Sequence, residues 1–187
     1  MRPRAYHKLW DLAVELLPLV EPSGVLCPEG TLDCPSVGLI LHQKVGRATY
    51  RATPLNVDTF AYTGGDGVHY SFLQLEDRLP EELPIVMTVP MARKENWNFV
   101  VGADLIEFLS LGCNFGYFSL EQLAYNWVGT VAELQSKANA YSASPTENKL
   151  RLSLNDRFGL RPWPDVQSRL RELRTEFLHH IRLPEPT

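Results

Sequence analysis

Hydrophobic residues near the N-terminus recur with the period of an α-helix. Over residues 6–19, leucine and alanine side chains return every three or four positions, while Lys8, Asp11 and Glu15 fall off that stripe. Pro18 discourages continuation of the helix, and the Pro- and Gly-rich stretch after it is typical of a loop. The pattern predicts an amphipathic N-terminal helix followed by a loop that extends through residue 38.

Between residues 37 and 102 the pattern changes to short runs of β-branched and aromatic residues that turn residues separate. Six runs are candidate strands: VGLILH, ATYRAT, VDTFAYT, VHYSFLQL, PIVMTVP and NFVVG. The prolines at both ends of PIVMTVP indicate a strand that is buried along its length and stops abruptly.

Three glycines and an aspartate, at positions 64–67, separate the third and fourth runs. An Asp-Gly pair between apolar runs is typical of a β-hairpin, because glycine accepts the positive φ that such turns require. A phosphate-binding loop would instead need a helix after the glycines and a Lys-Ser or Lys-Thr pair. Since the strand-like VHYSFL follows, the sequence predicts a hairpin turn.

From about residue 103 the helical period returns. The run ADLIEFLSLG predicts a helix for which Gly112 supplies a left-handed C-terminal cap. Ser119 and Gln122 have the spacing of a capping box, which predicts a helix from there to about residue 134. A proline at position 145 marks the start of a third helix, which Gly159 ends, and a fourth is predicted over residues 164–182.

The order of these elements is a helix, a block of five or six strands, and then four helices. Such segregation predicts an α+β fold with a mostly antiparallel sheet, an N-terminal helix and a C-terminal group of helices. The stretch NAYSASPTEN is a weak boundary. We therefore expect a main domain over residues 1–139 and a helical extension over residues 140–187 that packs on it.

Charge and cysteine content restrict the function. The 187 residues carry a net charge of −4, which disfavours a general nucleic-acid binder. The three cysteines are an odd number, so a reducing cytoplasm is a simpler expectation than a disulfide framework. No run approaches the roughly 18 apolar residues that a membrane helix needs, and no signal peptide is predicted.

Few residues suggest catalysis. Asp66 and His69 could act as an acid and a base, but the strand pattern predicts that His69 faces solvent. Cys113 could be a nucleophile, although its place at a helix C-terminus favours a small core residue, because the dipole there disfavours the thiolate. Cys27, Cys34 and His42 lack the spacing of a zinc site, so no metal is expected, and no cofactor motif is found.

The run LEDRLPEELP gathers four carboxylates around one arginine. Such a run is typical of a solvated loop, and the alternative is an acidic edge that docks a basic protein. Glu76 and Asp77 are the candidate contacts in this alternative. His179 and His180 have no neighbouring ligands in the sequence.

The runs TFAYTGGDGVHYSFL, PIVMTVP and NFVVGADLIEFLSLGCNFGYFSLEQLAY together resemble bacterial members of the SUKH superfamily over residues 58–125. The resemblance rests on a glycine-turn hairpin, a buried strand, and an FL-x-LG helix before an aromatic segment. It implies a non-enzymatic α+β binding module, because that superfamily shares no catalytic residues. Many bacterial relatives are immunity proteins that neutralise a secreted toxin.

We therefore expect a cytoplasmic protein-binding module, plausible as an immunity protein against a basic toxin domain. Its candidate partner contacts are Asp66, His69, Glu76 and Asp77. One alternative is a small hydrolase or transferase that uses His69 with Asp66, or Cys113. Another is a structural subunit with a large exposed apolar patch on the last helix.

Overall fold

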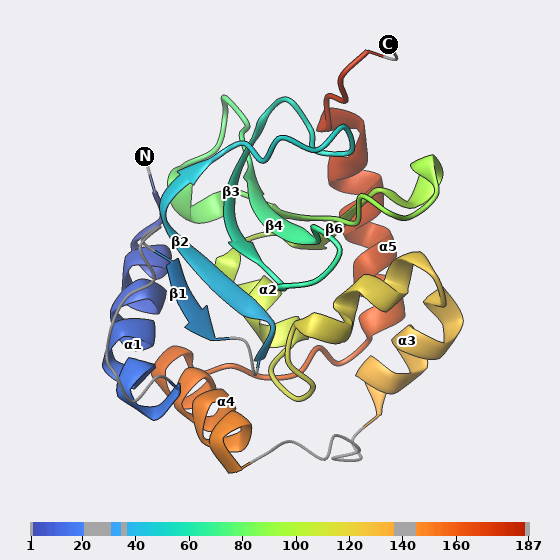
Figure 1. Cartoon of the computed structure of the whole chain (residues 1–187). Coiled ribbons are helices and arrows are strands. Elements are labelled where there is room, and N and C mark those ends of the chain that lie inside the picture. The colour runs from blue at the N-terminus through green and yellow to red at the C-terminus, as the bar shows by residue number, and fades with distance from the viewer. Residues whose placement is uncertain (1, 21–30, 35–36, 137–144, 186–187) are drawn as a thin grey trace.

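The computed structural model describes residues 2–20, 31–34, 37–136 and 145–185 (Figure 1). The helices are α1 (Arg4–Val20), α2 (Leu105–Leu111), α3 (Trp127–Gln135), α4 (Pro145–Phe158) and α5 (Val166–Phe177). The strands are β1 (Thr31–Cys34), β2 (Leu39–Gly46), β3 (Val57–Tyr62), β4 (His69–Leu73), β5 (Ile85–Thr88) and β6 (Asn98–Gly102). The 3₁₀ helices include η4 (Phe118–Ala124) and η5 (Leu178–His180).

The six strands form one antiparallel sheet in which spatial order equals sequence order. In Figure 1, α1 lies beside β1, α2 lies behind the sheet and α5 runs beside β6. The predicted α+β fold, with an N-terminal helix and C-terminal helices, is confirmed. Each strand pairs with the next strand along the chain.

Two strand predictions are wrong. The run ATYRAT is no strand, and residues 47–54 instead form a loop, called the cover loop below, that lies over one face of the sheet. The Arg47 side chain holds this loop in shape by donating hydrogen bonds to the carbonyls of Thr53 (3.0 Å) and Pro54 (2.8 Å). Strand β1 lies within a segment that the proline and glycine content predicts to be loop, and it forms by pairing with β2.

The glycine turn is a hairpin turn, as predicted. The Val68 amide donates to the Gly65 carbonyl at 3.0 Å, and the two central residues have positive φ, 48° at Asp66 and 71° at Gly67. Such angles give the turn the twist of the strands that it joins. A Cβ on Gly67 would also lie only 2.5 Å from the Tyr50 ring, so glycine is needed there for space as well.

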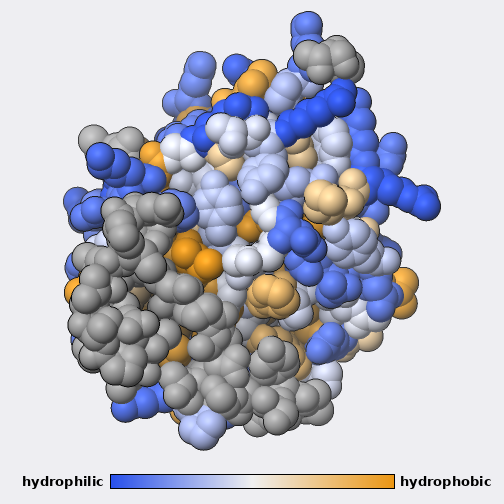
Figure 2. Space-filling view, in the orientation of Figure 1, coloured by the Kyte–Doolittle hydropathy of each residue, from blue (hydrophilic) through white to orange (hydrophobic). Residues whose placement is uncertain are grey.

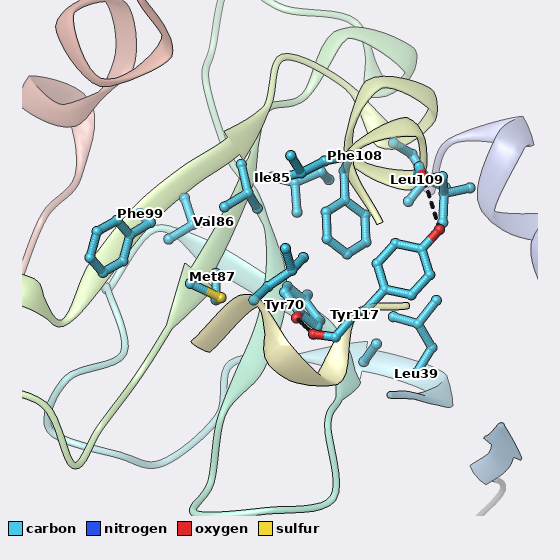
Figure 3. Close-up of a cluster of buried hydrophobic side chains, with 14 of the residues drawn as sticks. Leu39, Tyr70, Ile85, Val86, Met87, Phe99, Phe108, Leu109 and Tyr117 are labelled. Atoms are coloured by element: carbon cyan, nitrogen blue, oxygen red, sulfur yellow. Dashed lines mark hydrogen bonds between the residues drawn. The ribbon is translucent and has the colours of Figure 1, made fainter. Parts of the chain in front are cut away.

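Strand β4 is buried along its whole length, and so is β5. One face of the sheet is aromatic: the Phe60 and Phe72 rings lie 4.4 Å apart, and Tyr6 of α1 meets both of them edge-on. Phe108 of α2 packs 4.7 Å from Tyr70 (Figure 3). These contacts fix α1 and α2 on the same side of the sheet.

Two buried tyrosines connect this face to the segment before η4. The Tyr70 hydroxyl donates to the Tyr117 carbonyl at 2.6 Å, and the Tyr117 hydroxyl donates to the Leu109 carbonyl at 2.7 Å (Figure 3). The second bond satisfies a carbonyl in the last turn of α2, where helices lack internal partners. Burial raises the pKa of both phenols, so they remain neutral donors.

The opposite face of the sheet is polar beneath the cover loop. The Thr59 and Ser71 hydroxyls lie 2.9 Å apart, and Thr59 Oγ1 also accepts from the Ala48 amide at 3.2 Å. The Asn98 side chain accepts from the Thr88 hydroxyl and donates to the Ala52 carbonyl. Buried polar groups need such partners, so these bonds explain why the cover loop stays on the sheet.

The predicted helix over residues 119–134 is divided in two. The segment begins as η4 without a side-chain cap, so the proposed Ser119–Gln122 capping box is wrong. Helix α3 begins only after Asn126, whose side chain accepts from the Gly129 amide at 3.2 Å.

The predicted left-handed cap at Gly112 is also wrong, because its φ is −89°. A Cβ on Gly112 would lie 2.3 Å from the Tyr117 ring, so close approach of that ring explains the glycine.

The C-terminal helices share the main core. The apolar stripe of α5 is buried against the sheet side, and a bidentate ion pair joins Arg169 to Glu107 of α2, with Nε 2.7 Å from Oε1. Gly159 ends α4 with φ 63°, as predicted. Helix α5 ends at Phe177 and η5 follows, so the regular helix is shorter than the predicted 164–182.

Among the described residues, no helix combines the length and apolarity needed to cross a membrane.

We expect Tyr117→Phe to lower the free energy of unfolding by about 1–3 kcal/mol, because the Leu109 carbonyl then loses a buried donor. Urea denaturation followed by tryptophan fluorescence measures this loss. Tyr125→Phe is the matched control, since Tyr125 is 52% exposed, and a change of about 0.5 kcal/mol or less is expected. Equal stability of the two variants would contradict the role of the tyrosine pair.

Candidate functional site

The four predicted partner contacts do not form one site. Asp66 lies in the turn before β4, whereas Glu76 and Asp77 follow the same strand. A strand rises about 3.3 Å per residue, so the five residues of β4 separate the two groups by roughly 15 Å. Any single small ligand or side chain would reach only one of them.

His69 does not face solvent, and that prediction is wrong. Its side chain is 0% exposed, with Nδ1 2.7 Å from the Gly67 carbonyl oxygen and Nε2 3.1 Å from Thr53 Oγ1. The Tyr50 ring stacks on it at 5.7 Å between centroids. The strand pattern correctly places His69 and Ser71 on one face, but it contains no sign that the cover loop lies over that face.

The hydrogen bonds of His69 indicate a structural role. A carbonyl only accepts, so Nδ1–H donates to Gly67, and Nε2 is left to accept from the Thr53 hydroxyl. Burial lowers the pKa of His69, although the bond to Gly67 opposes this shift. The neutral ring thus connects the glycine turn to the cover loop. In this position the ring lies beneath Tyr50 and the cover loop.

Cys113 is also inaccessible. The residue is 1% exposed, and burial raises the pKa of its thiol to about 11, against a partial opposing effect of Arg151. Since the thiolate is the nucleophilic form, this thiol is unreactive at neutral pH. Cys27 lies outside the described residues. Within the described part of the chain, no three His, Cys, Asp or Glu side chains gather to hold a metal ion.

The acidic run forms a surface of mixed charge. Glu76 and Asp77 line an open polar cleft of about 660 Å³ together with His179, His180 and Arg182. The sequence does not predict that the acidic run lies beside residues 179–182, because about a hundred residues separate the two segments. Arg182 therefore brings a positive charge to the cleft that the two carboxylates line, which weakens the attraction of the proposed docking edge for a basic partner.

Helix α5 offers no apolar patch for assembly. Its stripe of Val166, Leu170, Leu173 and Phe177 is buried. The large hydrophobic side chains that are exposed in the described residues lie on other elements. Figure 2 shows the face seen in Figure 1, where small hydrophobic areas alternate with hydrophilic ones.

One group of exposed aromatic residues surrounds the glycine turn. We call Tyr50, Asp66, Phe118, Glu121 and Tyr125 the turn patch. Its aromatic members are 41%, 47% and 52% exposed, in chain order, and they come from the cover loop, from η4 and from the residue after η4. Sequence reasoning missed this group because it interpreted residues 119–134 as one ordinary amphipathic helix.

The backbone explains how the turn patch is assembled. In a 3₁₀ helix, side chains three positions apart share a face, so Phe118 and Glu121 point the same way. The Phe118 ring lies 3.6 Å from where a Cβ on Gly65 would stand, and Tyr50 packs against Gly67 on the other side. Both rings therefore lie against the turn, and the approach of Tyr50 requires the absence of a side chain at Gly67.

Charges in the turn patch are close enough to interact. Burial raises the pKa of Glu121, and repulsion from Asp66 raises it further. The pKa of the Tyr125 phenol is raised by burial and then by Glu121 and Asp66. The arrangement offers carboxylates beside exposed rings, which suits binding to another molecule.

Searches against models of protein families, curated proteins and solved structures find no match to this chain. The resemblance to the SUKH superfamily therefore stays a prediction that rests on the quoted sequence runs. The geometry of the turn patch is independent of that resemblance.

We expect the stability of the protein to fall as the pH drops below about 6.5, the ordinary pKa of histidine. Because the pKa of His69 is lowered in the folded state, the unfolded chain binds a proton first, and acid favours unfolding until the folded pKa is passed. His69→Gln should lose this part of the pH dependence. Urea midpoints at pH 7.5, 6.5 and 5.5 measure it.

His7→Gln is the matched control, because His7 is exposed on α1. This variant should keep the pH dependence of the parent protein. If His69→Gln and the parent lose stability in parallel between pH 7.5 and 5.5, burial of the His69 ring does not control the response.

Proposed function

We propose that this chain is a non-enzymatic protein-binding module that acts in the cytoplasm as an immunity protein and neutralises a toxin domain. The observation that carries the binding role is the turn patch, in which the exposed Tyr50 and Phe118 rings lie against the glycine turn and the exposed Tyr125 follows η4. Aromatic side chains dominate the energy of protein interfaces when a partner covers them. Of the groups in the enzyme alternative, His69 and Cys113 are buried, and Asp66 is exposed in the turn without the His69 ring beside it in solvent.

The rigidity of the turn favours binding, because little conformational entropy is lost on association. The Thr63 amide donates to the Val68 carbonyl at 3.1 Å, and the Val68 amide bonds back across the turn. His69 anchors the same turn from beneath through Gly67. Three exposed rings on such a support resemble the preformed anchor groups of stable interfaces.

The toxin as partner comes from the resemblance to the SUKH superfamily, whose bacterial members include many immunity proteins. The net charge of −4 is compatible with a basic toxin domain. Acidic side chains at the rim of an interface speed association with such a partner. Asp66 and Glu121 are placed for this role within the turn patch itself.

The test begins with the genes beside the one that encodes this chain, and its candidate partner is the C-terminal domain of a large toxin encoded there. We expect the chain to protect cells that express this domain and the purified proteins to bind each other. Phe118→Ala combined with Tyr125→Ala should weaken binding at least tenfold, or about 1.4 kcal/mol, and reduce protection. Calorimetry measures the affinity.

Leu152→Ala is the control, since Leu152 is 62% exposed on α4 and lies outside the turn patch. It should bind and protect as the parent does, and all variants should unfold at similar temperatures. A chain that gives no protection, or an aromatic double variant that binds with the affinity of the parent, would refute the proposed role of the turn patch.

A further inference from the structure

The two carboxylates of the turn patch lack opposite charges. Ion pairs among the described residues engage Glu15, Glu81, Glu107, Glu172 and Glu176 with arginines, but neither Asp66 nor Glu121 takes part in one. The Phe118 ring lies 3.6 Å from where a Cβ on Gly65 would stand, and Phe118 shares a face of η4 with Glu121, so Glu121 is on the side of η4 that faces the turn of Asp66. Repulsion from Asp66 raises the pKa of Glu121, which agrees with this placement. A cation placed beside two like charges relieves their repulsion, so this part of the surface is complementary to a partner with positive charge.

The aromatic residues beside the carboxylates suit the same kind of partner. Phe118 shares a face of η4 with Glu121. Tyr125 is close enough to both carboxylates for their negative charges to raise the pKa of its phenol. Cations bind to the faces of aromatic rings, and this attraction adds to that of nearby carboxylates. The planar guanidinium of arginine both stacks on rings and donates paired hydrogen bonds to carboxylates.

We propose that the turn patch binds an arginine or lysine side chain of the protein partner, with the cationic group between Asp66 and Glu121 and the side-chain stem against Phe118 and Tyr125. The inference rests on the proposed function and adds the chemistry of the contact. The polar cleft beside Glu76 and Asp77 is a poorer site for a cation, because the positively charged Arg182 lines it as well.

Selection of random peptides displayed on phage, with the immobilised full chain as target, tests this contact without knowledge of the partner. We expect the enriched peptides to contain an arginine or lysine. A synthetic copy of the strongest arginine-containing binder is then compared with the same peptide carrying citrulline, which keeps the shape of arginine but not its charge. The citrulline peptide should bind at least about tenfold more weakly.

Three double variants complete the test. Asp66→Asn with Glu121→Gln removes both charges from the turn patch, and asparagine tolerates the positive φ at position 66. Glu76→Gln with Asp77→Asn removes the same number of charges at the other end of β4. The third is Phe118→Ala with Tyr125→Ala. The Asp66/Glu121 variant and the Phe118/Tyr125 variant should bind the arginine peptide at least about tenfold more weakly than the parent. The Glu76/Asp77 variant should bind it with an affinity within about twofold of the parent.

The outcomes separate this inference from the proposed function. Peptides that need Phe118 and Tyr125 but bind equally well with citrulline, or after neutralisation of Asp66 and Glu121, would overturn the cation contact and leave an aromatic binding surface. Equal effects of the two charge-neutralised variants would show only a general influence of net charge and would also overturn it. Recovery of no peptide that depends on the turn patch would overturn both proposals.

Discussion

Strand β4 is buried on both of its faces, and the rest of the structure depends on this constraint. Side chains on a strand alternate between the two faces of the sheet. Because all five residues of β4 are buried, other elements must cover the sheet on both faces. The apolar side receives α1 and α2 through the rings of Tyr6 and Phe108. The polar side receives the cover loop, whose backbone satisfies Thr59 and Asn98. Burial without these bonds would be costly.

The two layers meet at the glycine turn, and their meeting links the fold to the proposed function. Tyr117 holds the start of η4 against β4 from the apolar side, while Tyr50 and His69 hold the turn from the polar side. As a result, Phe118 and Tyr50 approach the same turn from two directions. The exposed aromatic residues therefore lie on a backbone that hydrogen bonds hold in one conformation. Such preorganisation lets a few residues bind tightly, because little conformational entropy is lost on association.

Local patterns predicted the elements whose shape depends on neighbours in sequence. The Asp66–Gly67 pair indicated the hairpin because positive φ is a local requirement, and the prolines around PIVMTVP indicated a buried strand that ends on both sides. The ATYRAT run has the composition of a strand but forms the cover loop, because its polar groups bond to β3 and β6 rather than to an adjacent strand. The capping box at Ser119 failed because Tyr117, anchored in the core, imposes a 3₁₀ turn at that point.

The sequence by itself determined the α+β class, a mostly antiparallel sheet and the position of the hairpin turn, since periodicity and turn chemistry act over a few residues. Only the tertiary structure decided that His69 is buried and that Tyr50 and Phe118 lie against the same turn. These two residues are 68 positions apart in the chain, and a periodic pattern states which face of an element is apolar without stating what covers it. The candidate site therefore arises from packing between distant segments rather than from any motif in the chain.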